Sequence, residues 1–181
     1  MRLTSGQSEH HDGLEVSVHK KFSGNHEFFA AYTRSTARAN AVLDFSLDKP
    51  LFAQQVGGRL PWDAPNHLVS WGWVPIWKKF DLAYSLQWRS GFPLNVVNTN
   101  QQLVGPPNQL RFPSFFTLDL HVERRFHWWG YQWALRAGLN DITGRKNPAL
   151  VDNNIDSPRF LTFAGTQRRT LTARIRFLGR K

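Results

Sequence analysis

The sequence predicts an all-β fold, an antiparallel up-and-down transmembrane β-barrel segment of about seven or eight strands with short periplasmic turns and long external loops. Three observations predict it. Apolar and polar residues alternate along about seven segments, which is the period of a strand whose two faces meet different surroundings. The connections alternate between short and long, and aromatic residues gather with paired cations beside the short ones. Both habits are typical of outer-membrane barrels.

The alternation is clear in five segments and weaker in two, and most are close to the roughly 9–11 residues that a tilted strand needs to cross a bilayer. The clear segments are 14–19, 80–89, 116–123, 132–139 and 170–177, and the weaker ones run from His26 to Ser35 and from His67 to Val74. No segment has a convincing helical period. The nearest, Ala41 to Val56, is interrupted by Pro50, so we predict a loop there.

The short connections are predicted to lie at one end of the sheet and the long ones at the other. "FSGNH", "VPIWK" and "FHWWGY" read as tight turns. The long links are rich in Pro, Asn and Gly, and they cover roughly Ala39–Asn66, Phe92–Ser114 and Gly144–Gly165. This polarity favours a barrel over a soluble sandwich, whose alternating strands would bury the apolar face instead.

Paired cations followed by phenylalanine lie beside each short turn, at Lys20–Phe22, Lys78–Phe80 and Arg124–Phe126. Aromatic rings at headgroup depth with cations reaching lipid phosphate are typical of a membrane–water interface. We therefore expect a set of aromatic side chains to act as interface anchors. They are Trp71, Trp73, Trp77, Trp88, Trp128, Trp129, Tyr131 and Phe177.

The polar face of the alternating strands is predicted to line the barrel lumen. Its candidate residues are Glu15, His19, Asp81, Arg89, Asp119, His121, Glu123 and Arg136. Asp119, His121 and Glu123 lie about 7 Å apart along one face, a row that a metal or acid–base site could use. A lumen wall is polar by requirement and explains the row more simply.

Other groups of polar residues are also read as structural. His10 and His11 beside Asp12 lie in a polar terminus, and "DNNID" (Asp152–Asp156) lacks the glycine and terminal Glu of a calcium loop. No glycine-rich loop follows a strand as a phosphate cradle would. We expect no enzyme, no catalytic residue, no metal and no cofactor.

The chain has a formal net charge of +10 and no Cys, so it needs a polyanionic neighbour and contains no disulfide. The densest basic cluster comprises Arg168, Arg169, Arg174, Arg176, Arg180 and Lys181. Strand alternation runs through this cluster, so lipid phosphate and lumen lining explain it better than a nucleic-acid groove. We expect outer-membrane lipid and lipopolysaccharide phosphates as partners, and no nucleic acid.

Four stretches carry a family resemblance: "APNHLVSWGW" (Ala64–Trp73), "LQWRSGFPLNV" (Leu86–Val96), "FPSFFTLDLHVERRF" (Phe112–Phe126) and "LRAGLNDITGRKNPALVDNNIDSPRFLTF" (Leu135–Phe163). In this order they resemble consecutive late-barrel strands of TonB-dependent outer-membrane receptors, especially the Oar-like group that bears a carboxypeptidase-regulatory-like domain. The likeness covers roughly Gly13 to Phe177.

The resemblance implies a parent protein with a plugged barrel of about 22 strands that imports a bulky nutrient across the cell outer membrane of a Gram-negative-type envelope. We expect residues 1–12 to be disordered or an external-loop remnant, and residues 13–181 to be the C-terminal barrel segment. The chain shows no plug domain, no TonB box and no signal peptide. It is expected to need the rest of the barrel and the plug, to reach TonB only through those parts, and to be inactive in transport alone. Its cargo is unknown.

Two other functions stay open at this point. One is a stand-alone small barrel of eight strands with a structural or adhesive role, its additional strand running from Ala41 to Val56. The other is a soluble, basic β-protein that binds nucleic acid.

Overall fold

The computed structural model describes residues 8–24, 26–40, 56–77 and 79–180. Every regular element in this part of the chain is a strand, so the all-β prediction is confirmed. None of the described residues forms a helix long and apolar enough to cross a membrane. The strands are β1 (Glu9–Lys21), β2 (Glu27–Ala39), β3 (Gly58–Arg59), β4 (Asn66–Trp77), β5 (Phe80–Arg89), β6 (Pro93–Leu94), β7 (Leu110–Arg111), β8 (Phe115–Trp128), β9 (Tyr131–Asn140), β10 (Leu150–Val151), β11 (Phe163–Ala164) and β12 (Thr170–Arg180).

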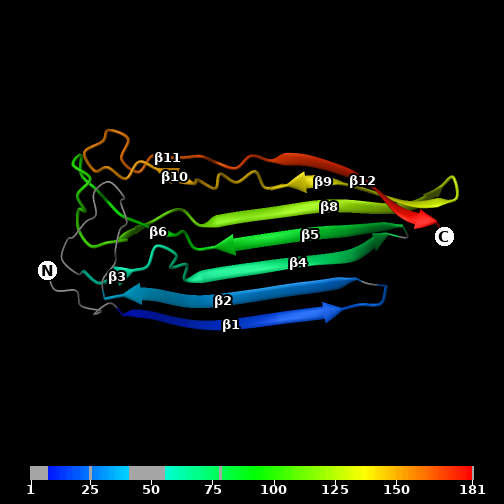
Figure 1. Ribbon diagram of the computed structural model, residues 1–181, viewed down its shortest axis with the longest axis horizontal. Coiled ribbons are helices and arrows are strands. Elements are labelled where there is room, and N and C mark those ends of the chain that lie inside the picture. The colour runs from blue at the N-terminus through cyan, green and yellow to red at the C-terminus, as the bar shows by residue number, and fades with distance from the viewer. Residues whose placement is uncertain (1–7, 25, 41–55, 78, 181) are drawn as a thin grey trace.

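The seven long strands form one antiparallel sheet in the order β1-β2-β4-β5-β8-β9-β12, with the short β3 paired to β2. Each long strand therefore lies beside the long strand before it in the chain, and the up-and-down topology is confirmed. Figure 1 shows these strands side by side, with β1 at one edge and β12 at the other. Two small hairpins, β6–β7 and β10–β11, lie outside this sheet.

The sheet is open rather than closed. Among the described residues no pairing joins β1 to β12, so both edge strands have one side without a neighbouring strand. The additional strand considered between Ala41 and Val56 lies outside the described residues except for Val56. The closed-barrel part of the prediction is therefore not seen in this sheet.

The two ends of the sheet differ as predicted. Short turns join β1 to β2, β4 to β5 and β8 to β9 at one end, which we call the turn end. The long connections lie at the other end, which we call the loop end, and the structure describes them at residues 56–65, 90–114 and 141–169 (Figure 1). The second turn falls later than expected, because β4 continues through Trp77 past a bulge near Pro75. A proline is tolerated in a strand at such a bulge.

Residues Glu9–Asp12 correct the predicted boundary at the start of the sheet. We expected this stretch to be disordered or part of a loop, but it pairs with residues 36–39 of β2. Backbone pairing with an existing strand does not require an apolar side chain, so a polar segment extends the sheet without any alternation to reveal it.

The register assigns every strand residue to one of two faces, because residues directly opposite each other point to the same side. One row of directly opposed residues crosses five strands and defines what we call the polar face. It consists of Glu15, Thr33, His67, Arg89 and Phe115. The next row defines the apolar face. It consists of Val16, Tyr32, Leu68, Trp88 and Phe116.

Burial is concentrated away from the apolar face. The buried hydrophobic residues are Ala37, Ala39, Leu60, Leu94, Val96, Val97 and Ala134, of which Ala37, Ala39 and Leu60 form one cluster at the loop end. On the apolar face, by contrast, no large apolar side chain among the described residues is buried. Leu171 is 74% exposed and Leu14 69% exposed. The sheet therefore leaves a broad apolar surface that nothing in the described chain covers.

Candidate functional site

The polar face holds all eight residues predicted to line a lumen. Registers across β1, β2, β4, β5 and β8 align His19 with Asp119 through Phe29, Trp71 and Ser85. Asp81 aligns with Glu123, which aligns with Arg136 of β9. Glu15, Arg89 and His121 fall on the same face at other heights. The face is therefore shared, but the eight side chains are spread over four strands and do not form one compact site.

Glu123 is the centre of the strongest charged cluster on this face. Its carboxylate is only 2% exposed and accepts a hydrogen bond from the Arg176 guanidinium at 2.6 Å. Arg125 approaches the other carboxylate oxygen at 3.5 Å and also lies 5.3 Å from the centre of the Trp73 ring. A buried carboxylate needs such partners, since burying an unpaired charge is strongly unfavourable. Arg176, which the sequence suggested only as part of a basic cluster, thus has a defined structural role.

The row Asp119, His121 and Glu123 does not act as a single group. The Asp119 carboxylate accepts the backbone N–H of Asp141 at 2.7 Å, where β9 ends. The ring of His121 lies 2.9 Å from the Thr172 hydroxyl of β12. Since Glu123 pairs with arginines, the three side chains turn to three different partners.

The other two groups of possible metal ligands, His10–Asp12 and "DNNID", do not form a metal site in the described structure either. Among the described residues, no group of three or more His, Cys, Asp or Glu side chains could hold a metal ion. His10 pairs with Asp12 at 3.1 Å on an exposed stretch of β1. In the "DNNID" loop, Asp152 accepts hydrogen bonds from the Ser157 hydroxyl and the Asn154 backbone, which are the contacts of a loop that stabilises itself.

The loop end is held together by polar anchors that sequence reasoning missed. Asp63, 4% exposed, forms an ion pair with Arg111 and accepts the Ala37 backbone N–H at 2.8 Å. Arg111 also donates to the carbonyls of Asp63 and Gly91, at 2.6 and 2.9 Å. Asp63 and Arg111 are 48 positions apart in the chain. No local pattern could have revealed this pair, because only the tertiary fold brings the two loops together.

A second anchor fixes the connection between β9 and β12. The side-chain amide of Asn147, 6% exposed, accepts the backbone N–H of Phe116 at 3.0 Å and donates to its carbonyl at 2.8 Å. Arg145 adds a hydrogen bond to the Ser114 hydroxyl at 2.8 Å. The loop that carries Asn147 is therefore clamped to the start of β8.

These anchored loops border an open cavity of about 360 Å³ at the loop end of the polar face. Arg89 enters it from the last position of β5, with Phe92 and Phe112 on one connection and Asn147 and Pro148 on another. The Arg89 guanidinium lies 3.9 Å from the centre of the Phe92 ring and 4.8 Å from that of Phe115. Of the residues predicted to line a lumen, Arg89 borders this pocket, and His121 and Arg136 border another, of about 420 Å³, between β8, β9 and β12.

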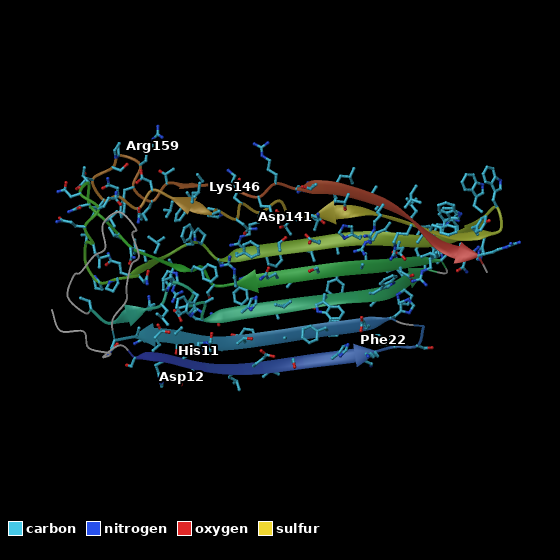
Figure 2. All side chains as sticks on the ribbon, viewed as in Figure 1. His11, Asp12, Phe22, Asp141, Lys146 and Arg159 are labelled. Carbon is cyan, nitrogen blue, oxygen red and sulfur yellow. The ribbon has the colours of Figure 1, made fainter. Side chains whose placement is uncertain are left out.

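The predicted aromatic anchors divide into two groups. Five of them lie at the turn end: Trp77, Trp128, Trp129, Tyr131 and Phe177. Of these, Trp129 is 81% exposed and Trp77 73% exposed. Close ring contacts join Trp128 to Trp129 at 4.6 Å and Tyr131 to Phe177 at 5.4 Å. Figure 2 shows rings projecting from the tip of the β8–β9 turn. Trp88 lies on the apolar face near the other end of the sheet.

The interpretation of Trp71 and Trp73 as interface anchors is corrected by the register. Both lie on the polar face, where Trp71 stacks with Phe29 at 5.5 Å and approaches His19 at 6.2 Å. Trp73 is the ring beneath Arg125. In this strand large residues occupy both faces, so alternation alone assigns neither ring to a side.

The basic residues beside the short turns lie against aromatic rings. The Lys20 ammonium is 5.2 Å from the centre of Phe22, and Arg124 is 5.3 Å from that of Phe80. Figure 2 labels Phe22 at the tip of the β1–β2 hairpin. Such cation–π contacts hold the cations at the turn end of the sheet.

Comparison of the chain with protein-family models, curated proteins and solved structures gives no match. The polar and apolar faces, the turn and loop ends and the Arg89 pocket are therefore the features from which a function is inferred.

Proposed function

We propose that this chain is part of the transmembrane barrel of a TonB-dependent outer-membrane receptor that takes up a bulky nutrient. The observation that carries the proposal is the uncovered apolar face opposite a face that holds most of the polar and charged strand residues, together with Phe29, Trp71 and Trp73. Apolar side chains exposed over a whole sheet are unfavourable in water, and a patch of this kind marks a surface made for lipid or for another protein. In a membrane barrel the apolar face meets lipid and the polar face lines the lumen.

Strand length agrees with a bilayer. The seven long strands have between 10 and 14 residues. A tilted strand needs about 9–11 residues to cross the hydrocarbon core. Since ordinary strands average about 5–6 residues, these lengths favour a membrane over a soluble sandwich.

The open edges support a segment of a larger barrel. In hydrocarbon each unpaired backbone group costs several kcal/mol, so β1 and β12 need partner strands before the sheet can lie in lipid. Further strands of the same barrel supply them in the proposed assembly. The polar face then meets a plug domain and cargo, and the segment alone does not transport. Lipid and lipopolysaccharide phosphates are the proposed partners of the cations at the turn end.

The test uses the absence of natural cysteine, which allows one label at a time. Ser85 and Leu86 are adjacent in β5 but lie on the polar and apolar faces respectively. Ser85→Cys and Leu86→Cys, each carrying a spin label, are compared in the cell fraction that contains the chain. We expect an outer-membrane fraction, with the label at position 86 accessible to oxygen and the label at position 85 accessible to a water-soluble relaxation agent.

A chain recovered in the soluble fraction, with both labels equally accessible to the water-soluble agent, would contradict the proposal. Binding to nucleic acid that weakens steeply with salt would then support the soluble basic β-protein instead.

A further inference from the structure

We propose that the cavity around Arg89 is a preformed binding site for a small carboxylate ligand with an apolar body. This deepens the proposed function, because it assigns a ligand class to the lumen side of the loop end. Its biological role rests on that function, whereas binding itself is measured separately from membrane location.

The unpaired guanidinium of Arg89 is the first of three features that support a binding site. The guanidinium contacts the rings of Phe92 and Phe115, and among the described residues it makes no hydrogen bond or ion pair. Arg111 and Arg176 have such partners in Asp63 and Glu123, whereas the partly buried Arg59 and Arg136, like Arg89, have none among the described residues. Ring contacts satisfy the flat faces of a guanidinium but leave its in-plane N–H donors free. Within the described part of the chain, the in-plane N–H groups of Arg89 therefore have no protein acceptor.

The size and lining of the cavity are the second such feature. Its volume, about 360 Å³, is at the lower end of the range for small-molecule pockets. Apart from Arg89, Asn147 and Gln167, the lining is mostly aromatic rings, prolines and small residues, including Phe112 and Pro148. The Asn147 amide is already used on the Phe116 backbone. One unpaired cation among apolar walls matches a ligand with one anionic group and an apolar body.

The rigidity of the pocket walls is the third such feature. Phe92 and Phe112 are held opposite each other by a backbone hydrogen bond of 2.9 Å, which extends the β6–β7 hairpin. Gly91 permits this approach, since a Cβ there would lie 1.7 Å from the Phe112 carbonyl oxygen. The Arg111 and Asn147 anchors fix the two connections on either side. A pocket held in this way loses little conformational freedom on binding.

A carboxylate is the favoured anion because the guanidinium fork matches its two oxygens, and two parallel hydrogen bonds form. Most of the residues that line the pocket come from three short stretches of the sequence, "RSGFP", "FPSFF" and "RKNP", and Ala149, Gly165 and Gln167 complete it. Their convergence on one cavity is a property of the tertiary structure.

The test measures binding of N-acetyl-phenylalanine and of its neutral carboxamide to the full chain, in whichever cell fraction holds it. We expect the carboxylate to bind at least about tenfold more tightly than the carboxamide, the factor expected for one charge-assisted interaction. Because both ligands are tested on the unchanged protein, a folding defect cannot produce this difference. Equal binding of the two, or no binding of the carboxylate, would overturn the proposal.

Two variants then assign the effect to Arg89. Arg89→Gln should reduce carboxylate binding by about tenfold or more and leave carboxamide binding nearly unchanged. Arg159→Gln removes the same charge from the loop end, where Figure 2 labels it, but outside the cavity, and it should bind like the unchanged chain. A loss of carboxylate binding equal in both variants would show that general charge, rather than the pocket, is responsible.

Discussion

The loop end and the turn end of this sheet are stabilised in opposite ways. At the loop end polar groups are buried and paired, as Asp63 is with Arg111, and the small hydrophobic cluster lies beside them. At the turn end the largest apolar side chains are exposed, with Trp129 81% and Trp77 73% accessible. The first arrangement is complete within the chain. The second lacks a partner, because exposed indole rings gain little from water and are typical of a lipid interface.

This difference indicates which parts of the chain depend on lipid or detergent for their stability. The loop end should keep its structure in any medium that preserves its ion pairs and hydrogen bonds. The turn end and the apolar face should respond to lipid or detergent. Four predictions test this contrast, from the largest expected effect on stability to the smallest.

Asp63→Ala should destabilise the loop end most. It leaves the Arg111 guanidinium without its carboxylate and the Ala37 N–H without its acceptor. Removing one partner of a buried pair costs about 3–5 kcal/mol. Denaturant unfolding followed by tryptophan fluorescence measures the loss. Asp12→Ala is the matched control, since its pair with His10 is exposed and should contribute less than about 1 kcal/mol. Equal losses in the two variants would refute the contrast between buried and exposed pairs.

Gly138→Ala should destabilise the middle of the sheet by about 1–3 kcal/mol through overpacking. A Cβ at this position would lie 2.1 Å from the Leu120 carbonyl oxygen and 2.5 Å from the His121 Cα, so β8 and β9 would have to separate. Gly13→Ala in β1 is the control, because its Cβ would meet atoms only at 3.5 Å and beyond. The free energy of unfolding of both variants gives the answer. A larger loss for Gly13→Ala would contradict the close approach of β8 and β9.

The β1–β2 turn should lose stability as the pH rises. A hydrogen bond to the Ser23 carbonyl and another to the Asp81 carboxylate raise the pKa of His26 above its usual value. Protonated His26 is thus favoured in the folded state, and this stabilisation is complete below the unfolded pKa of about 6.5. It disappears as the pH rises through the higher folded pKa.

NMR titration of the His26 ring checks this prediction, and Asp81→Asn should bring its pKa closer to the usual value. An unchanged pKa in that variant would show that Asp81 does not contribute.

Trp129→Asn should change stability least and membrane association most. Trp129 and Gly130 form the two-residue β8–β9 turn with φ of 52° and 75°. Asn tolerates this left-handed backbone better than Trp does. The gain offsets the lost stacking on Trp128, so unfolding should shift by less than about 1 kcal/mol.

Association with lipid vesicles is the readout that separates the two ends. Trp129→Asn should weaken it, whereas Trp62→Asn, which removes an exposed ring at the loop end, should weaken it less. If neither substitution alters vesicle binding, the turn-end rings are not interface anchors.

Much of the fold could be predicted because strand alternation is a local property. The segments 80–89 and 170–177 correspond closely to β5 (Phe80–Arg89) and β12 (Thr170–Arg180). The shared face of Asp119, His121 and Glu123 follows from their spacing alone. Alternation could not detect Glu9–Asp12, whose place in β1 depends on pairing with β2. Nor could it assign the faces of Trp71 and Trp73, because β4 has large residues on both sides.

Apart from the start of β1 and the faces of β4, the sequence was enough to predict the seven long strands, their two faces and the separation of short turns from long loops, because each depends on neighbouring residues and the period of the backbone. Only the tertiary structure decided which distant side chains meet. The Asp63–Arg111 pair, the Glu123–Arg176 pair and the Arg89 cavity join residues from separate connections or strands. Such contacts depend on sheet register and loop packing, and no local pattern in the chain encodes either in a readable form.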